Sequence, residues 1–568
     1  MSIDIEAAGS GRLAERSPIE QDDTEKPTNY SIRGLETSAE TSLHHALQAR
    51  HISMIAIGGA LGTGLLVGTG RALAESGPGS LLIAFLFMGC IIFMIMAAIG
   101  EIVAWLPLSA GFAGYASRYC HPALGFTLGW TYWFNYVIAA PNQLTAVALV
   151  IQFWVPRETV NPGVFIAIFI VIIFCINYFG GIRFFGEFEF WLSSFKVIVI
   201  VGVILLALVL AAGGGPNGDA PGFRYWKDPG AFAEVYTTGP LGKFLGFWSV
   251  MVNATFAYLG TELVGTTAAE ARSPRRSIPK AIRLTFYRIL LFYCLSVFLV
   301  GLVVPYNSEE LAFAAGQANP GANASAFVVA AKLAGIKVLP HIINACICLF
   351  VFSASNSDLY IASRTLYGLA SDRAAPAIFK RTDRRGVPYV ALVACISFAL
   401  LAFMNVSNDS RNVFQYFVNL CTVLGLLTWI SILITHIRFV RGRALQNIPD
   451  SAMPYVAPQG ARGSIIAVIV CAIVALTKNF GVFITQGKPF DYASFITGYI
   501  GIPVYFILFF GHMLVTKSKL VKLEDIDFFT GKEIVDRYEA EFLEEERAKV
   551  ENASGWAKVY RRFVAWLF

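Results

Sequence analysis

The sequence predicts an all-α polytopic membrane protein, and three observations support this fold class. Of its 568 residues, 56% are hydrophobic and only 14% are charged, which is far from the balance of a soluble globular chain. Apolar runs of about 18 or more residues recur along the chain, each long enough to cross a hydrocarbon core of roughly 30 Å. A glycine-rich segment interrupts one of these runs, and a segment with a single glycine interrupts another. Together they predict a helical bundle in which two membrane helices are broken.

The apolar runs predict twelve transmembrane helices, over residues 52–73, 80–106, 123–154, 163–181, 188–212, 243–270, 284–304, 336–370, 388–406, 412–437, 464–484 and 493–515. The loop at 213–218, Gly-Gly-Gly-Pro-Asn-Gly, separates five helices from the next five. The polar segments before and after the apolar runs predict an N-terminal tail and a C-terminal tail on either side of one transmembrane domain. Their bounds are 1–50 for the first tail, 51–516 for the membrane domain (repeats at 51–213 and 241–437, last two helices at 464–516) and 517–568 for the second tail.

The first helix is predicted to break at residues 58–64, Gly-Gly-Ala-Leu-Gly-Thr-Gly. Glycine gives up the most backbone freedom on ordering, so four glycines in seven positions disfavour a helix. The sixth helix has a similar interruption at 256–262, Phe-Ala-Tyr-Leu-Gly-Thr-Glu. Broken backbone at membrane depth is tolerated where protein or a water-filled cavity satisfies it, and secondary transporters bind substrates there. The pattern therefore predicts a 5+5 inverted repeat with discontinuous helices 1 and 6; plain kinking is the alternative.

Basic residues gather in the loops predicted to share a side with the N-terminus. They are Arg272, Arg275, Arg276, Lys280, Arg283, Arg373, Lys380, Arg381, Arg384, Arg385, Arg438, Arg441, Arg443 and Arg462. This asymmetry predicts that both termini are cytoplasmic, and it explains the net charge of +6 without a nucleic-acid partner. The polar first fifty residues predict no cleavable signal peptide. Sequons at Asn323, Asn405 and Asn408 fall in predicted outer loops, where they could be glycosylated.

The two interruptions predict a site for a zwitterion. Backbone N–H groups of the broken first helix suit a carboxylate, because the restarting half-helix presents its positive end there. Carbonyls of the broken sixth helix suit an ammonium group, so the site fits an α-amino acid. A polar run in the eighth helix could line the cavity or form interhelical hydrogen bonds. The candidate substrate-binding residues are Gly59, Ala60, Gly62, Thr63, Gly64, Phe256, Ala257, Tyr258, Gly260, Ser353 and Asn356.

Three ionisable residues lie within predicted helices: Glu101, Lys196 and Glu262. Ionisable groups at membrane depth are costly and are functional candidates by default, here for proton coupling. For Glu101 an interfacial charge that caps a helix is an equal alternative. The charged stretch at 533–549 predicts a solvated amphipathic helix.

Several motifs resemble those of the fungal amino acid permeases, the yeast amino acid transporter family within the amino acid–polyamine–organocation superfamily. The resemblance extends from His51 to about Lys532. It rests on the segments at 50–59 (Arg-His-Ile-Ser-Met-Ile-Ala-Ile-Gly-Gly), 62–64 (Gly-Thr-Gly), 260–265 (Gly-Thr-Glu-Leu-Val-Gly), 270–279 (Glu-Ala-Arg-Ser-Pro-Arg-Arg-Ser-Ile-Pro), 363–370 (Ser-Arg-Thr-Leu-Tyr-Gly-Leu-Ala) and 525–527 (Asp-Ile-Asp).

The resemblance implies a leucine-transporter-like fold, a plasma-membrane location and uptake of L-amino acids with protons. It implies that Phe256 is a gating aromatic, that Lys196 stands where sodium-coupled relatives hold a sodium ion, and that Glu262 is the permease glutamate of helix 6. It also implies that Lys26 could accept ubiquitin, with ubiquitin ligase machinery as a partner of the cytoplasmic tails. No cofactor is expected.

The substrate is predicted from two segments, Phe-Phe-Gly-Glu-Phe-Glu-Phe-Trp at 184–191 and Ala-Pro-Asn-Gln-Leu-Thr at 140–145. Both are similar to the dicarboxylic branch, which imports aspartate and glutamate. Asn135 departs from that branch, where a lysine is expected, so a neutral or broad-range permease stays open. The rivals are a transport-inactive amino acid receptor, a channel and a membrane enzyme. The enzyme is disfavoured because the chain lacks His-Glu-x-x-His, a P-loop and a Cys/His ligand set.

Overall fold

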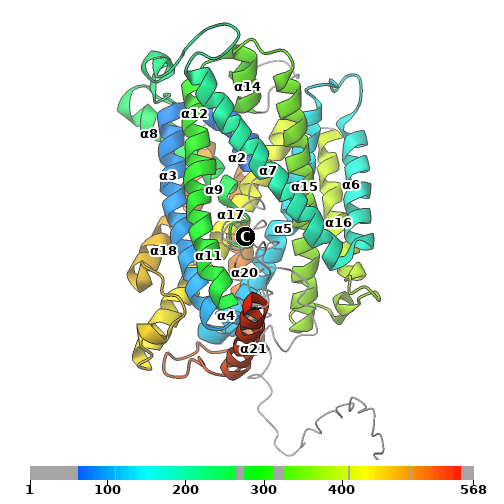
Figure 1. Cartoon of the computed structure of the whole chain (residues 1–568), viewed down its shortest axis with the longest axis vertical. Helices are drawn as coiled ribbons and strands as arrows, with labels where there is room; N and C mark the ends of the chain where they lie inside the picture. Colours follow the sequence, from blue (N-terminus) through cyan, green and yellow to red (C-terminus); the bar gives the residue numbers. More distant parts are fainter. Residues whose placement is uncertain are drawn as a thin grey trace, which may run out of the picture. The chain divides into compact units, whose positions relative to one another are not determined.

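A computed structural model describes residues 62–108, 111–263, 265, 274–312, 325–406, 410–484 and 489–551. The predictions for Lys26, Gly59, Ala60, Asn323 and Asn408 lie outside these described residues. Within them the chain is built of helices, as the sequence predicts, and Figure 1 shows their arrangement.

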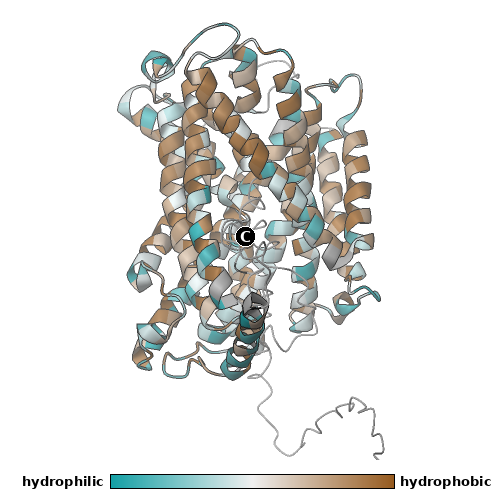
Figure 2. Ribbon diagram, in the orientation of Figure 1, coloured by the Kyte–Doolittle hydropathy of each residue, from teal (hydrophilic) through white to brown (hydrophobic). Residues whose placement is uncertain are grey.

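Ten described helical segments are long and apolar enough to cross a membrane. Their bounds are Gly68–Trp105, Pro122–Ile151, Pro162–Phe179, Phe184–Ala211, Ile278–Val303, Leu339–Ser371, Tyr389–Val406, Asn412–Leu445, Gly460–Phe483 and Tyr492–Thr516. Each overlaps a predicted run, Gly68–Trp105 also covers the end of the run at 52–73, and Figure 2 shows hydrophobic residues along most of their length. The two other predicted runs, 52–73 and 243–270, are the ones expected to contain breaks.

Local sequence sets where these helices begin. Helix α6 (Pro162–Phe179) starts with proline, whose missing N–H is not needed in a first turn, and the Asn161 side chain accepts from Gly163 N at 2.9 Å. Helix α5 (Pro122–Ile151) starts in the same way behind His121. Proline at the first helical position with a polar cap before it therefore fixes both starts.

In the first interrupted run the described chain begins with the short helix α2 (Thr63–Leu66), followed by α3 (Gly68–Trp105). Helix α3 bends sharply at Gly77, where φ is +79°, a value that favours glycine. The sequence predicts two separate helices, at 52–73 and 80–106. In the structure α3 contains the end of the first and nearly all of the second, and the turn at Gly77 joins them.

A later segment holds this turn. Gly79 N donates to Ala231 O at 2.7 Å, and Ala233 N donates to Ser76 O at 2.9 Å. A Cβ atom on Gly77 would lie 2.9 Å from the Ala231 carbonyl oxygen, so the close approach also requires glycine. The segment after the fifth predicted helix therefore packs on the first helical pair.

In the second interrupted run helices α8 (Gly239–Ser249) and α9 (Met251–Tyr258) replace one long helix. Helix α9 ends because Leu259 takes ψ of 145° and Gly260 takes φ of +86°. The backbone thus leaves the helical path within the predicted 256–262 segment.

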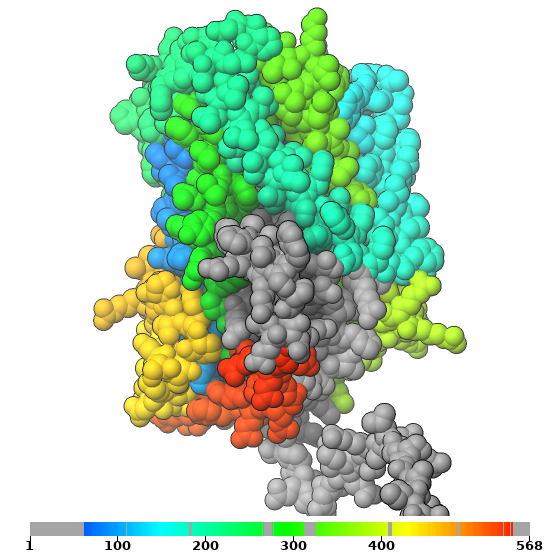
Figure 3. All heavy atoms as spheres, viewed as in Figure 1, coloured from blue at the N-terminus to red at the C-terminus, as the bar shows by residue number. Residues whose placement is uncertain are grey.

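Helices α5 and α17 (Ser410–Leu445) lie in the interior, since 78% and 83% of the residues in the most apolar stretch of each helix are buried. The outer helices are far less buried, at 22% for α6. On α7 (Gly181–Ala211) the exposed side chains of Trp191, Ile198 and Leu205 recur every seven residues, and Figure 3 shows α7 at the surface. Such an apolar stripe suits contact with lipid, and it leaves the opposite face of α7 turned inwards.

Candidate functional site

The inward face of α7 carries a buried ion pair. Glu189, Ser193 and Lys196 follow one another at spacings of four and three, which places them on one face of the helix. Lys196 Nζ lies 3.6 Å from Glu189 Oε1, and neither side chain is more than 2% exposed. Ser193 Oγ also donates to Glu189 Oε1, at 3.3 Å. A buried charge pair of this kind is stable only with good geometry and additional hydrogen bonds.

Helix α15 (Leu339–Ser371) completes the pair. Ser353 Oγ lies 3.1 Å from each carboxylate oxygen of Glu189, to which it donates. Two residues predicted for different roles, Lys196 and Ser353, therefore meet at one carboxylate. Glu189 was not singled out in the sequence, although its position seven residues before Lys196 was a usable signal.

A second polar chain begins at the predicted substrate segment. Thr63 Oγ1 donates to Gln143 Oε1 at 2.9 Å, and Gln143 Nε2 donates to Asp358 Oδ2 at 3.2 Å. These residues come from α2, α5 and α15, so three helices meet here. A Cβ on Gly62 would lie 3.8 Å from the Ala354 side chain, which confirms that the start of α2 contacts α15. The sequence predicted Thr63 for the site but missed both Gln143 and Asp358.

The two interrupted segments contact each other directly. A Cβ atom on Gly64 would overlap Ala257 Cα and lie 2.9 Å from Ala257 N. This approach brings the predicted carboxylate ligands on α2 against the predicted ammonium ligands on α9. Phe256, one residue earlier, packs edge-on against Phe414 of α17, with ring centroids 6.2 Å apart.

Glu262 lies just after the α9 interruption and is 1% exposed. Its carboxylate accepts from Tyr136 Oη at 3.1 Å, from Trp429 Nε1 at 3.3 Å and from Gly260 N at 3.3 Å. The donors belong to α5, α17 and the interrupted segment itself. Glu262 thus ties the non-helical turn to the two innermost helices.

Other predicted site residues have different surroundings. Asn356 accepts from Asn177 Nδ2 at 2.9 Å, which links α15 to α6. Tyr258 donates to Phe85 O at 3.0 Å and stacks on Tyr293, so its hydroxyl is used in packing with α3. Asn135 is buried on α5, and in the described part of the chain its Oδ1 atom has no hydrogen-bond partner.

Glu101 belongs to a separate cluster near the ends of α3 and α17. His436 Nε2 lies 3.1 Å from Glu101 Oε2, and Arg443 Nη2 lies 3.4 Å from Oε1. Ala457 N donates to the same carboxylate at 2.9 Å, and Arg443 also pairs with Asp450 at 2.8 Å. An arginine, a histidine ring and a backbone amide therefore surround the Glu101 carboxylate and connect three parts of the chain.

The chain is similar to known amino acid permeases along most of its length. The family model described as Amino acid permease matches residues 51–524. The dicarboxylic amino acid permease of Saccharomyces cerevisiae is 52% identical over 534 residues, 93% of this chain and 87% of the relative. The proline-specific permease of Emericella nidulans is 38% identical and covers 88% of this chain and 91% of its own length. The lysine-specific permease of Saccharomyces cerevisiae is 38% identical, over 85% of this chain and 77% of its own.

A solved structure shares the fold. A mutant form of the manganese transporter of Eremococcus coleocola superposes with a TM-score of 0.51 at 13% sequence identity. The match covers 83% of this chain and 94% of that chain. At this identity the likeness concerns the fold alone.

Proposed function

This chain belongs to the amino acid permease family, and we propose that it imports amino acids with protons across the plasma membrane, with aspartate and glutamate as preferred substrates. The observation that carries the proposal is the direct contact of two interrupted segments, at Gly64 and Ala257, beside a buried polar network. The relative at 52% identity is named for dicarboxylic amino acids, whereas relatives at 38% are named for proline and lysine.

We further propose twelve spans in a 5+5 inverted repeat, with helices 1 and 6 discontinuous and both termini cytoplasmic. Support comes from the ten described spans and from the shorter helices that stand in the two remaining predicted runs. In this architecture the substrate site lies between the repeats, and alternating access moves one set of helices against the other.

In the proposed site the substrate carboxylate binds backbone N–H groups of the first interruption, from Gly59 to Gly64. The substrate ammonium binds carbonyls near Phe256 and Ala257. Thr63 supports this placement because its hydroxyl already donates to Gln143 and can be redirected by a bound carboxylate. The Phe256–Phe414 contact is suited to cover the site on one side.

For proton coupling we propose the Lys196–Glu189 pair, Glu262 and Asp358. Asp358 is added because Gln143 connects its carboxylate to Thr63 by two hydrogen bonds. Protonation of Asp358 would change the hydrogen bond that Gln143 donates to it. Through the bond between Gln143 and Thr63, it would then change the substrate-binding segment. Glu101 takes second place, because its ion pair with Arg443 lies in a separate cluster.

The test is uptake of labelled aspartate, leucine and arginine by permease-deficient yeast that express this chain, at external pH 5 and 7. We expect aspartate to lead and uptake to be faster at pH 5. Leadership by leucine or arginine would refute the dicarboxylic preference, and equal uptake at both pH values would refute proton symport. Absence of uptake with the protein at the cell surface would favour the receptor.

The substrate preference can be tested further with Asn135→Lys, which introduces the cation expected in this branch. If position 135 contacts the substrate side chain, the variant should lower KM for aspartate while KM for leucine does not fall. Equal effects on both substrates would place position 135 outside the selectivity site. A Lys196→Met carrier that still accumulates aspartate against its gradient would contradict the coupling role of Lys196.

A further inference from the structure

The segment after the last predicted span is packed into the protein. We call residues 521–530, between α20 (Gly501–Thr516) and α21 (Lys532–Glu551), the C-terminal clasp. Ile526 and Phe528 of the clasp are only 3% and 0% exposed. The Phe528 ring stacks on Tyr119 with centroids 5.7 Å apart and meets Phe439 edge-on at 5.3 Å. Two apolar anchors thus hold the clasp against α4 (Gly111–Tyr119) and α17.

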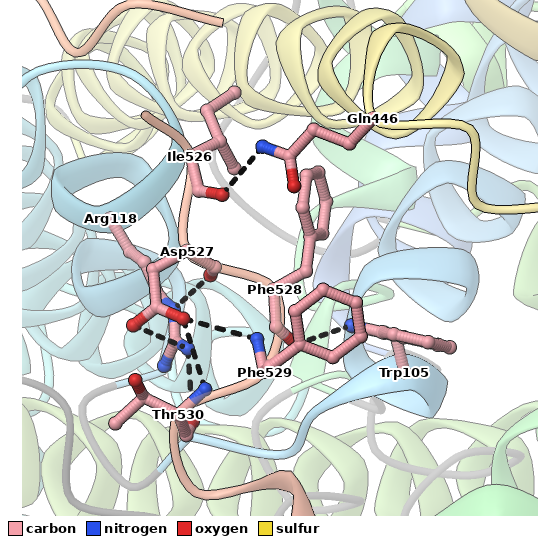
Figure 4. Close-up of polar contacts among 8 residues, drawn as sticks. All are labelled: Trp105, Arg118, Gln446, Ile526, Asp527, Phe528, Phe529 and Thr530. Carbon is pink, nitrogen blue, oxygen red and sulfur yellow. Dashed lines mark hydrogen bonds and ion pairs between the residues drawn. The ribbon is translucent and has the colours of Figure 1, made fainter. Parts of the chain in front are cut away.

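Side chains from the helix bundle bind the clasp backbone. Gln446 Nε2, at the end of α17, donates to the carbonyls of Leu523, Glu524 and Ile526 at 3.3, 3.2 and 2.8 Å. Trp105 Nε1, at the end of α3, donates to Phe528 O at 2.9 Å, and Figure 4 shows both side chains directed at the clasp. All these hydrogen bonds are accepted by backbone carbonyls of the clasp. They therefore depend on the backbone conformation of the segment.

Arg118 contacts both the backbone and a side chain of the clasp. Arg118 Nε donates to Asp527 O at 2.6 Å, and its Nη2 donates to Thr530 O at 2.9 Å. The same Nη2 pairs with Asp527 Oδ2 at 3.1 Å, while the Arg118 side chain is 3% exposed. Asp527 Oδ1 accepts from the backbone amides two and three residues further on, those of Phe529 and Thr530 (Figure 4). Asp527 therefore both shapes the turn and pairs with a buried guanidinium.

The two acidic residues of the Asp-Ile-Asp motif differ in environment. Asp527 is engaged as described, whereas the Asp525 side chain is exposed and has no hydrogen bond or ion pair with the part of the chain that the structure describes. The chain thus offers a matched pair of aspartates two positions apart, one docked and one free.

Helix α21 extends these contacts to the second half of the chain. Arg275 of α11 (Pro274–Arg288) pairs with Asp536 at 2.5 Å and with Glu539 at 2.7 Å. The clasp and α21 together therefore contact α3 and α4, which precede the loop at 213–218, and α11 and α17, which follow it. Helices from both proposed repeats are joined at this one end.

We propose that the C-terminal clasp is a conformational lock. When docked it holds the ends of α3, α4 and α17 together, and its Arg118–Asp527 contact has to release before the site opens at this end. The proposal rests on the proposed alternating-access transport, because only relative motion of these helices would strain the clasp. It predicts that the docked clasp slows the opening step.

The lock can be tested through Cys120, whose carbonyl accepts from Val521 N of the clasp at 3.0 Å. Cys120 is 5% exposed, and burial raises the pKa of its thiol to about 11, in spite of the opposing charge of Arg438. The thiolate is the reactive form, and an exposed cysteine has a pKa near 8.5, so full release would speed maleimide labelling at pH 8 on the order of 100-fold.

The experiment uses full-length chains in which Cys120 is the only cysteine, in membranes open to the reagent. Asp527→Asn is expected to raise the Cys120 labelling rate at least about fivefold and to speed exchange of preloaded amino acid, whereas Asp525→Asn should change neither.

Equal labelling of the two asparagine variants would overturn the proposal. Faster labelling of Asp527→Asn without any change in exchange rate would also overturn it, because the clasp would then be structural only. If Asp527→Asn does not reach the membrane, Gln446→Leu, which removes the side-chain amide that contacts three clasp carbonyls, is the second variant, with the same two readouts. Labelling requires no transport, so failure of the lock is distinguishable from failure of the proposed function.

Discussion

Substitution of Gly64 by alanine tests the contact between the two interrupted segments. The added methyl group would overlap Ala257 Cα and lie 3.1 Å from Ala257 Cβ, and the obstacle is largely backbone, which cannot rotate away. Overpacking of this kind costs about 1–3 kcal/mol. Alanine recovers about 0.5–1 kcal/mol because it loses less backbone freedom than glycine in a helix. Because the obstacle here is backbone, the overpacking cost lies in the upper part of its range, about 2–3 kcal/mol, and the net strain is roughly 1–2 kcal/mol.

This strain acts on the state in which α2 touches α9. A destabilisation of 1–2 kcal/mol changes a two-state population by a factor of about 5–30. If this state is part of the transport cycle, uptake per molecule at the cell surface should fall by a similar factor. The assay is initial-rate aspartate uptake, normalised to surface protein that is measured with a fluorescent tag.

One control makes the result specific. Gly202→Ala places the same methyl group in open space on α7, away from the proposed substrate site. We expect uptake by this variant to stay within about twofold of the parent. If Gly64→Ala transports as well as Gly202→Ala, the contact with Ala257 does not matter for transport and the proposed pairing of the two segments is refuted.

Three further predictions concern charged groups. Glu262→Gln keeps an acceptor for the neighbouring donors, so surface expression should persist while acid stimulation of uptake is lost; stimulation equal to the parent's would exclude Glu262 from coupling. Glu101→Gln leaves the buried Arg443 with only Asp450, its more exposed partner, as a carboxylate. The expected cost is about 3 kcal/mol, measured as a lower melting temperature in detergent, and an unchanged melting temperature would contradict this. At Asp527, burial raises the pKa, but hydrogen bonds from Thr530 and the Arg118 charge outweigh it, so the pKa lies below its ordinary value. Its stabilisation is thus complete above the unfolded pKa of about 3.9 and is lost only as pH falls through the lower folded pKa. Hydrogen exchange of the clasp amides, corrected for intrinsic rate, should therefore stay the same between pH 7 and 5, and loss of protection at pH 5 would contradict the assignment.

The membrane spans could be predicted from sequence because length and hydropathy are local properties. Helix ends such as those at Pro122 and Pro162 follow from a proline with a capping residue before it. The chain path at Gly260 was also predictable, because a glycine inside a helical pattern permits the positive φ observed there. In each case neighbouring residues carry the whole signal.

The polar partners could not be predicted in the same way. The spacing of Glu189 and Lys196 places both on one face of a helix, but it does not say that Ser353 of a distant helix completes the pair. Gln143 lies in an apolar helix, and its role as a link becomes visible only in the folded chain, where it hydrogen-bonds to both Thr63 and Asp358. Such contacts depend on helix packing, which hydropathy does not specify.

The C-terminal segment shows the same limit. Residues 517–568 were expected to form a cytoplasmic tail, and the stretch at 533–549 a solvated helix. The helix is present as α21, but Arg275 pairs with it, and Val535 is buried. A short motif with two aspartates reads as polar surface, because its docking depends on Trp105, Arg118 and Gln446, which lie far away in the sequence.

The backbone clamp on the Gly77 turn bears on how the chain can be assembled. Residues 231 and 233 hydrogen-bond to the turn but come after the glycine-rich loop at 213–218. If the gene were split at that loop, the fragment with the first five predicted helices would lack residues 231 and 233. The backbone groups of its Gly77 turn would then lose these hydrogen-bond partners. Despite a repeated architecture, the two fragments would then be obligate complements: each should be degraded when expressed alone, and both should persist when they are synthesised together.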